Sequence, residues 1–124
     1  MKNLVARSLL LVGLGLAPSV ALADPKAELK AGTGIENREI TGAGDSFKKT
    51  DTVYVWSNVT DADGKKVAHV WKLDGKEVFK ASFDIKSKRW RLNSKRHTPK
   101  PGAYVVEAQT EDGTKIGEVS FKVE

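Results

Sequence analysis

The stretch VAHVWKLDGKEVFKASFDI, residues 67–85, decides the fold class. Its first half alternates as a strand does, with one face formed by Val67, His69, Trp71 and Leu73. Its second half alternates in the same way, with one face formed by Phe79, Ala81, Phe83 and Ile85. Between the halves lies Asp74-Gly75, a residue pair that favours the tight turn of a β-hairpin. The stretch therefore predicts two antiparallel strands that each bury one face.

The same signals recur on both sides of this hairpin. Strand-favouring runs occupy residues 51–60, 88–93, 103–110 and 119–123, with turn-forming residues between them and no helical periodicity. Six or seven short strands predict an all-β fold, an immunoglobulin-like antiparallel β-sandwich of about seven strands. A small closed β-barrel is the alternative. Pro101-Gly102-Ala103-Tyr104 resembles the start of the penultimate strand of such sandwiches, which predicts a tyrosine corner between the Tyr104 hydroxyl and the preceding loop.

Residues 1–23 have the pattern of a secretory signal peptide. Lys2 and Arg7 are followed by a short apolar run and by the small-residue cleavage site Ala21-Leu22-Ala23. The run is shorter than the ~20 apolar residues of a membrane-spanning helix, although an uncleaved anchor is the alternative. We expect cleavage after Ala23 and a periplasmic or secreted mature chain without a transmembrane segment. Residues 24–33 predict a flexible N-terminal lead, and residues 34–124 predict the β-sandwich domain.

Charge and cysteine content exclude several classes of function. The chain has 21 Lys and Arg against 16 Asp and Glu, and two bases leave with the signal peptide, so the mature balance is 19 − 16 = +3. A balance this small does not favour nucleic acid as a partner. The absence of cysteine excludes disulfides, thiol nucleophiles and cysteine zinc sites. One domain of this size is too short for dinucleotide-binding or barrel enzymes, and we expect no cofactor.

Five pieces of the sequence carry a family resemblance. They lie, in order, at residues 35–42, 67–71, 89–95, 102–107 and 117–123. The most specific are the His-x-Trp motif formed by His69 and Trp71 and the run from Arg89 to Lys95. In this order the pieces resemble a bacterial domain-of-unknown-function family, the one numbered twenty-nine fourteen. The resemblance implies an envelope-associated, β-rich module and implies no particular reaction.

The most unusual charge pattern lies in residues 86–100, called the basic stretch below. It holds seven bases and no acid, whereas the rest of the mature chain has 19 − 7 = 12 bases against 16 acids. Because guanidinium groups bind phosphate and carboxylate through paired hydrogen bonds, the stretch predicts an anion-binding face. Its expected ligand-binding residues are Arg89, Arg91, Ser94, Lys95, Arg96 and His97. The alternative is a solvated strand whose bases protect a sheet edge from aggregation.

Strand alternation also predicts the sides of this stretch and the surroundings of the histidines. It places Trp90 inside and Arg89 outside. His69 lies on an apolar strand face, which predicts a hydrogen-bonded core residue. No metal site is expected, because nothing in the spacing pairs His69 with the one other histidine, His97. Ser94 and His97 have no nearby acid to orient the histidine, so no catalytic triad is predicted.

Together these features predict a non-enzymatic, exported domain that binds an anionic component of the cell envelope. The expected partners are peptidoglycan, lipopolysaccharide or a lipid headgroup; an uncharacterised hydrolase is the enzyme alternative. A second hypothesis is an interaction or structural module that contacts an envelope protein through exposed aromatic residues or a sheet edge. The run from Val53 to Trp56 is apolar on both faces, so filling the core with one face is expected to expose Tyr54 and Trp56.

Overall fold

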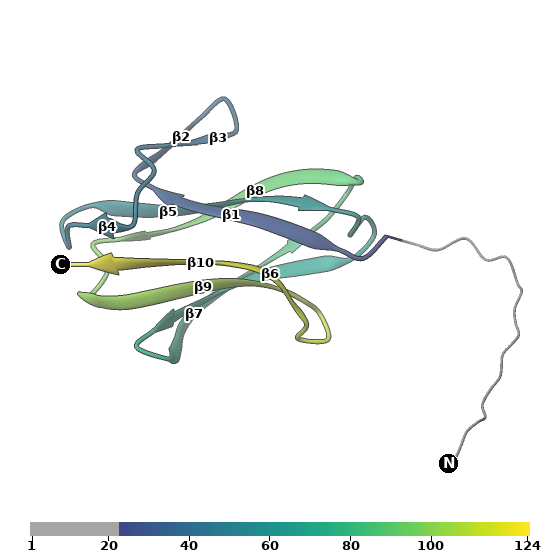
Figure 1. Ribbon diagram of the computed structural model, residues 1–124. Helices are drawn as coiled ribbons and strands as arrows, with labels where there is room; N and C mark the ends of the chain where they lie inside the picture. The colour runs from purple at the N-terminus through teal and green to yellow at the C-terminus, as the bar shows by residue number, and fades with distance from the viewer. Residues whose placement is uncertain (1–22) are drawn as a thin grey trace, which may run out of the picture.

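The computed structural model describes residues 23–124, which form ten β-strands and no helix (Figure 1). The predicted signal peptide, apart from Ala23, lies outside the described residues. Within residues 23–124 there is no helix that could cross a membrane.

Two β-sheets pack face to face, and a separate hairpin lies outside them (Figure 1). One sheet has three strands, in the order β1 (Lys26–Gly32), β5 (Thr52–Thr60) and β8 (Arg89–His97). The other has five, in the order β4 (Ser46–Phe47), β10 (Lys115–Val123), β9 (Gly102–Thr110), β6 (Lys66–Leu73) and β7 (Lys76–Asp84). The hairpin consists of β2 (Gly34–Glu36) and β3 (Glu39–Thr41). The sheets are open rather than closed into a barrel, and the predicted immunoglobulin-like sandwich is confirmed.

The local signals that predicted this fold occur where they were expected. Asp74 and Gly75 have φ angles of 49° and 88° and join β6 to β7, as a tight hairpin turn requires. The Tyr104 hydroxyl donates a 2.7 Å hydrogen bond to the Lys100 carbonyl oxygen, so the predicted tyrosine corner is confirmed. The core between the sheets is built from the inward residues of each strand, including the fully buried Trp71 and Val106.

The prediction of a flexible lead over residues 24–33 is wrong, because β1 occupies most of that segment. β1 pairs antiparallel with β5 from Lys26 opposite Thr60 to Gly32 opposite Tyr54. Its inward side chains are small apart from Leu29, and for that reason the segment carried little apolar signal. Small residues also let β1 approach β10, where a Cβ atom on Gly117 would lie 2.1 Å from the Ala27 carbonyl oxygen. The sandwich therefore begins at β1 and not at residue 34.

The two sides of the sandwich differ as a result. β1 and β10 lie against each other on one side. On the other side, β7 and β8 are the outermost strands of their sheets.

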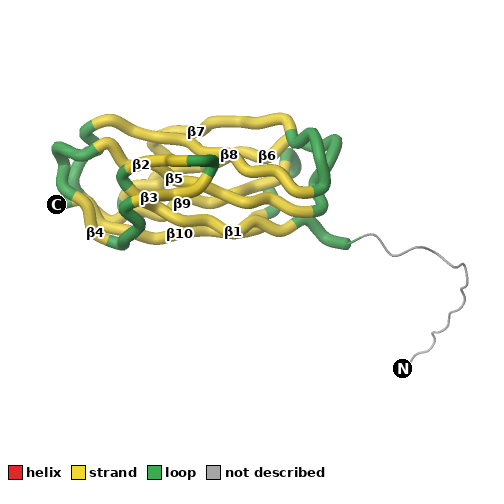
Figure 2. The backbone as a smooth tube through the Cα atoms, turned by 90° about the horizontal axis from the view of Figure 1, so that it is seen from above, coloured by secondary structure: helices red, strands yellow, loops and turns green. Residues whose placement is uncertain are grey.

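The β2–β3 hairpin turns at Asn37 and Arg38, whose φ angles of 51° and 62° fit a two-residue turn. It lies across the outer face of the three-stranded sheet, above β5 (Figure 2).

Candidate functional site on the three-stranded sheet

The residues of β8 alternate between solvent and core, as the sequence predicted. Arg89, Arg91 and Lys95 are exposed on the outer face of the three-stranded sheet. Leu92 is buried, and Trp90 is partly buried against the core. The six predicted ligand-binding residues therefore do not share one surface.

Ser94 is the clearest correction to the predicted site. Its side chain is 7% exposed and lies in the core between the two sheets. Its Oγ accepts a 2.9 Å hydrogen bond from Nε1 of Trp71 and lies 2.7 Å from Nδ1 of His69. The strand period of two places Ser94 on the opposite face from its neighbour Lys95, so it cannot contact a ligand bound outside.

Arg96 and His97, at the end of β8, have partners within the chain. The Arg96 guanidinium lies 4.4 Å from the centre of the Phe79 ring on β7, on the edge of the sandwich and away from the outer face. His97 Nδ1 lies 2.9 Å from the Thr52 Oγ1 across the ladder. Of the predicted set, Arg89, Arg91 and Lys95 are brought together on one face, and His97 lies at its end.

β1 adds two bases that the sequence analysis did not include. Lys26 lies in the same row as Arg89, with Thr60 of β5 between them. Lys30 lies in the row of Trp56. We call Lys26, Lys30, Arg89, Arg91 and Lys95 the basic face. The alternation of charged residues with Ala27, Leu29 and Ala31 could have revealed this strand and its outward lysines.

Several cations of the basic face have no ion pair within residues 23–124. Lys30 lies 3.9 Å from Glu28, and Arg91 pairs with Glu39 of the hairpin. Lys26, Arg89 and Lys95 have no such partner. The Lys95 ammonium instead lies 5.6 Å from the centre of the Tyr54 ring.

The outer face of the five-stranded sheet also carries bases, and two of them are paired. Lys66 binds Asp84 at 2.9 Å, and Lys72 binds Glu107 at 3.2 Å. The hydrogen bond from Lys66 lowers the pKa of the Asp84 carboxyl below its usual value. Lys76, Lys80 and Lys122 of this sheet have no ion pair within residues 23–124. The basic face therefore differs by its two guanidinium groups, Arg89 and Arg91, rather than by a larger number of unpaired bases.

The prediction that Tyr54 and Trp56 are exposed together is wrong for Trp56. Both residues face outward from β5, yet Trp56 is only 4% exposed because the β2–β3 hairpin covers it. Its Nε1 donates a 2.7 Å hydrogen bond to the Arg38 carbonyl oxygen in the hairpin turn. Tyr54 is partly buried beside Lys95. No open aromatic patch formed by these two residues exists.

The prediction that His69 is a hydrogen-bonded core residue is confirmed. The side chain is fully buried, with Nε2 2.8 Å from the Ser57 Oγ and Nδ1 2.7 Å from the Ser94 Oγ. Burial lowers the pKa of His69 to about 4, so the ring is neutral at physiological pH. Its polar contacts are two hydroxyls rather than a carboxylate, which gives the imidazole no partner to orient it as a base.

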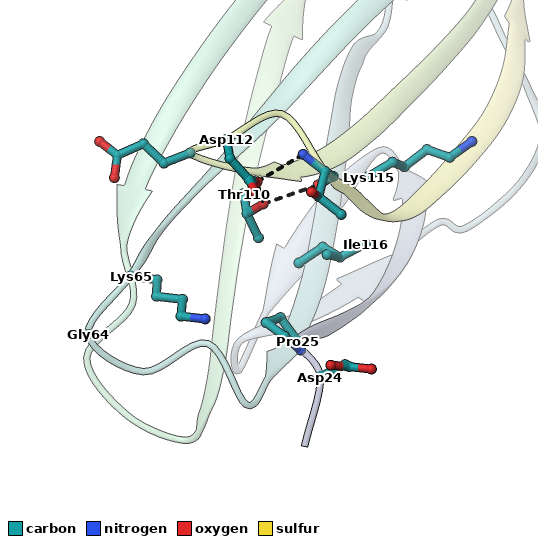
Figure 3. A pocket seen from close by; sticks show the side chains of 10 residues that line it. Asp24, Pro25, Gly64, Lys65, Thr110, Asp112, Lys115 and Ile116 are labelled. Carbon is teal, nitrogen blue, oxygen red and sulfur yellow. Dashed lines mark hydrogen bonds between the residues drawn. The ribbon is translucent and has the colours of Figure 1, made fainter. Parts of the chain in front are cut away.

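A hollow of about 740 Å³ opens at the end of the sandwich where β1 begins (Figure 3). Some of its polar groups already have partners: the Asp112 carboxylate accepts from the Thr110 hydroxyl and the Thr114 amide, and Lys115 pairs with Glu118 outside the lining. The lining carries both signs of charge and shares no residue with the basic face. Within the described part of the chain, no three His, Cys, Asp or Glu side chains are grouped to hold a metal ion.

Comparison with known families finds one that is similar to the second half of the chain. The model of the family described as "Protein of unknown function (DUF2914)" matches residues 64–123. By this match, residues 64–123 are similar to the DUF2914 family. The resemblance predicted from the sequence is thereby confirmed from β6 to β10, whereas its first piece, residues 35–42, lies outside the match. No curated protein sequence matches the chain.

Among solved structures, the chain is similar to the CARDB domain of a Pyrococcus furiosus protein, crystallised in complex with di-metal ions. The TM-score is 0.51 at 10% sequence identity, covering 85% of this chain and 96% of that domain. This similarity supports the sandwich fold alone.

The two most specific sequence pieces both lie within the matched residues, and the structure brings them into contact. His69 and Trp71 of β6 both contact the Ser94 hydroxyl of β8, which belongs to the opposite sheet. The motif residues His69 and Trp71 therefore form polar contacts that connect the two sheets through the core of the sandwich. The surface residues of β8, in contrast, are available to solvent.

Proposed function

We propose that this domain is an exported, non-enzymatic binding module that holds an anionic component of the cell envelope on its basic face. The observation that carries the proposal is the row Arg89, Arg91 and Lys95 on β8, joined by Lys26 and Lys30 on β1. Three of these five bases have no ion pair within residues 23–124. Exposed, unpaired cations can bind phosphate or carboxylate without first breaking an internal contact.

The spacing of the cations favours a ligand with several anionic groups. Outward residues of a strand repeat every two positions, about 6.6 Å apart. Arg89 and Arg91 are separated by one such step, and Lys95 lies two steps further along. Peptidoglycan, lipopolysaccharide and anionic lipid surfaces each present anions repeatedly, so several weak contacts act together. Export rests on the predicted signal peptide, and the burial of His69 supports a role without catalysis.

The test is co-sedimentation of residues 24–124 with isolated peptidoglycan sacculi and with vesicles that contain anionic lipid. Binding is measured at low and at physiological salt, because screening weakens contacts between exposed charges. The test variant replaces Arg89, Arg91 and Lys95 by glutamate. A matched control replaces Lys76, Lys80 and Lys122 by glutamate, which makes the same change in net charge at exposed positions of the five-stranded sheet.

We expect salt-sensitive binding that weakens about tenfold or more in the test variant, since three exposed charge contacts are each worth up to about 1 kcal/mol. The control variant should bind much as the native chain does. Equal losses in both variants would mean that net charge rather than the basic face is responsible. Binding of neither sacculi nor vesicles would contradict the proposal.

One observation favours a second candidate function, a module that pairs with a partner protein. β8 is an edge strand, and it pairs with β5 from Arg89 to His97 without a bulge. Such an edge can accept an extended peptide strand, and its bases favour an acidic one. Retention of the domain by an acidic strand peptide, together with no binding to sacculi or vesicles, would favour this function over the first.

A further inference from the structure

The β2–β3 hairpin is attached to the sandwich as a separate unit. It forms its own two-stranded sheet, joined to neither of the larger sheets. Its second connection to the sandwich runs through Gly42, whose φ is +63°, and Gly44, around which a Cβ would meet nothing within 4 Å. Glycine permits the backbone changes that a moving segment needs. Figure 2 shows this hairpin extended across the outer face of the three-stranded sheet.

Backbone hydrogen bonds from Thr33 to Thr41 and from Gly44 to Ala31 anchor the base of the hairpin. Two polar side-chain contacts hold its far end against the sheet. One is the hydrogen bond from Trp56 Nε1 to the Arg38 carbonyl oxygen. The other is the ion pair between Glu39 and Arg91, whose side chains are 53% and 37% exposed. Water and salt screen an ion pair this exposed, so another anion can replace the carboxylate at little cost.

Two side chains on the outer face of β5, Trp56 and Asn58, have the chemistry to contact a ligand that displaces the hairpin. Trp56 presents an indole ring that the hairpin shields from water. Asn58 lies across the ladder from Arg91 and two positions along from Trp56. Its Oδ1 is buried and accepts no hydrogen bond from any described residue. A buried acceptor without a donor is uncommon in proteins, and a hydroxyl group would satisfy it.

We propose that the β2–β3 hairpin is a flap over a binding site for an acidic sugar, and that Glu39 occupies Arg91 in place of the anionic group of that sugar. On binding, the phosphate or carboxylate of the ligand displaces the Glu39 carboxylate and pairs with the Arg91 guanidinium. The hairpin then lifts, the sugar ring stacks on Trp56, and a sugar hydroxyl donates to the Asn58 Oδ1. The inference rests on the proposed function and adds to it the class of ligand and the way the site opens.

The test uses NMR of the mature chain, residues 24–124, and follows the indole N–H signals of the tryptophans. The Trp56 signal, assigned through Trp56→Phe, reports loss of the bond to Arg38. The Trp71 signal is an internal control, since that indole is bound to Ser94 in the core. Two acidic sugars, N-acetylmuramic acid and N-acetylglucosamine phosphate, separate a carboxylate source from a phosphate source. N-acetylglucosamine and inorganic phosphate serve as probes with only the ring or only the anion.

We expect at least one acidic sugar to shift the Trp56 signal and leave that of Trp71 in place, with weaker effects from the ring or the anion alone. Glu39→Gln should tighten binding of that sugar about two- to fivefold, the range that an exposed ion pair supports. Glu36→Gln is the matched control: it removes the same charge from the same hairpin at a carboxylate that forms no ion pair among the described residues.

An unchanged Trp56 signal with every acidic sugar would overturn the flap. So would equal affinities of Glu39→Gln and the native chain, or an equal gain from Glu36→Gln, which would indicate a general effect of charge. These results are independent of the co-sedimentation test. Sacculi can still bind Arg89 and Lys95 with the hairpin closed, in which case the proposed function stands and the flap fails.

Discussion

The two faces of the three-stranded sheet carry polar groups that are satisfied in different ways. On the inner face, Ser57 and Ser94 contact His69, which belongs to the opposite sheet. On the outer face, the Trp56 indole is bound by the hairpin, and the Asn58 Oδ1 has no partner among the described residues. Residues that are neighbours in the chain therefore belong to unlike environments.

The difference shows how stability and binding are separated within one strand. The inner contacts are enclosed between two packed sheets, where an unsatisfied polar group is costly. The outer contacts face solvent or a hairpin, where exchange for a ligand is inexpensive in free energy. We expect substitutions at inner positions to change stability and substitutions at outer positions to change binding.

The largest effect on stability is expected from Ser94→Val. The substitution leaves the Trp71 indole N–H and the His69 Nδ1 without their hydroxyl partner in the core. Two unsatisfied buried groups should lower the free energy of unfolding by about 4 kcal/mol, measured by urea denaturation. Asn93→Val places the same side chain at the adjacent exposed position and should change stability by less than about 0.5 kcal/mol. Similar losses in the two variants would remove the distinction between the faces.

The next effect is a loss of stability in acid that depends on His69. Burial lowers the pKa of His69 from 6.5 to about 4 in the folded protein. The unfolded chain therefore binds a proton between these pH values and the folded chain does not, so stability falls as pH decreases through this window. The loss should approach about 3 kcal/mol near pH 4.

Thermal and urea unfolding from pH 7 to pH 4 would measure this dependence in the native chain and in two variants. His69→Gln should remove the part of the fall in the free energy of unfolding that this residue causes between pH 7 and pH 4. His97→Gln removes the one other histidine, which is exposed at the end of β8, and should leave the change in place. A pH dependence that survives His69→Gln unaltered would show that other groups cause it.

The smallest expected effect comes from Trp56→Phe on the outer face. The substitution removes the hydrogen bond to the Arg38 carbonyl, which contributes about 1 kcal/mol. Because that contact holds only the hairpin, amide exchange should speed up in residues 34–41 and change little in β6. Tyr54→Phe is the control on the same strand, since the Tyr54 hydroxyl forms no hydrogen bond within residues 23–124. Uniformly faster exchange across the sandwich would mean that Trp56 stabilises the whole domain.

Local sequence signals predicted much of the fold and only part of the candidate site. Asp74-Gly75 predicted a turn because its conformation depends on the two residues themselves. Arg89 and Arg91 were placed outside correctly because strand alternation is a property of the backbone. β1 was missed because Ala27, Leu29 and Ala31 give a weak local signal, and its stability comes from pairing with β5.

The sequence by itself determined the strands from β5 to β10, the hairpin turn at Asp74-Gly75, the tyrosine corner at Tyr104 and the side of β8 to which each base belongs, since these follow from local backbone geometry. Only the tertiary structure decided what covers each face. Trp56 is buried by residues of a hairpin far from it in the chain, and Ser94 is bound by residues of the opposite sheet. No local pattern encodes such contacts, because they exist only after the chain has brought distant segments together.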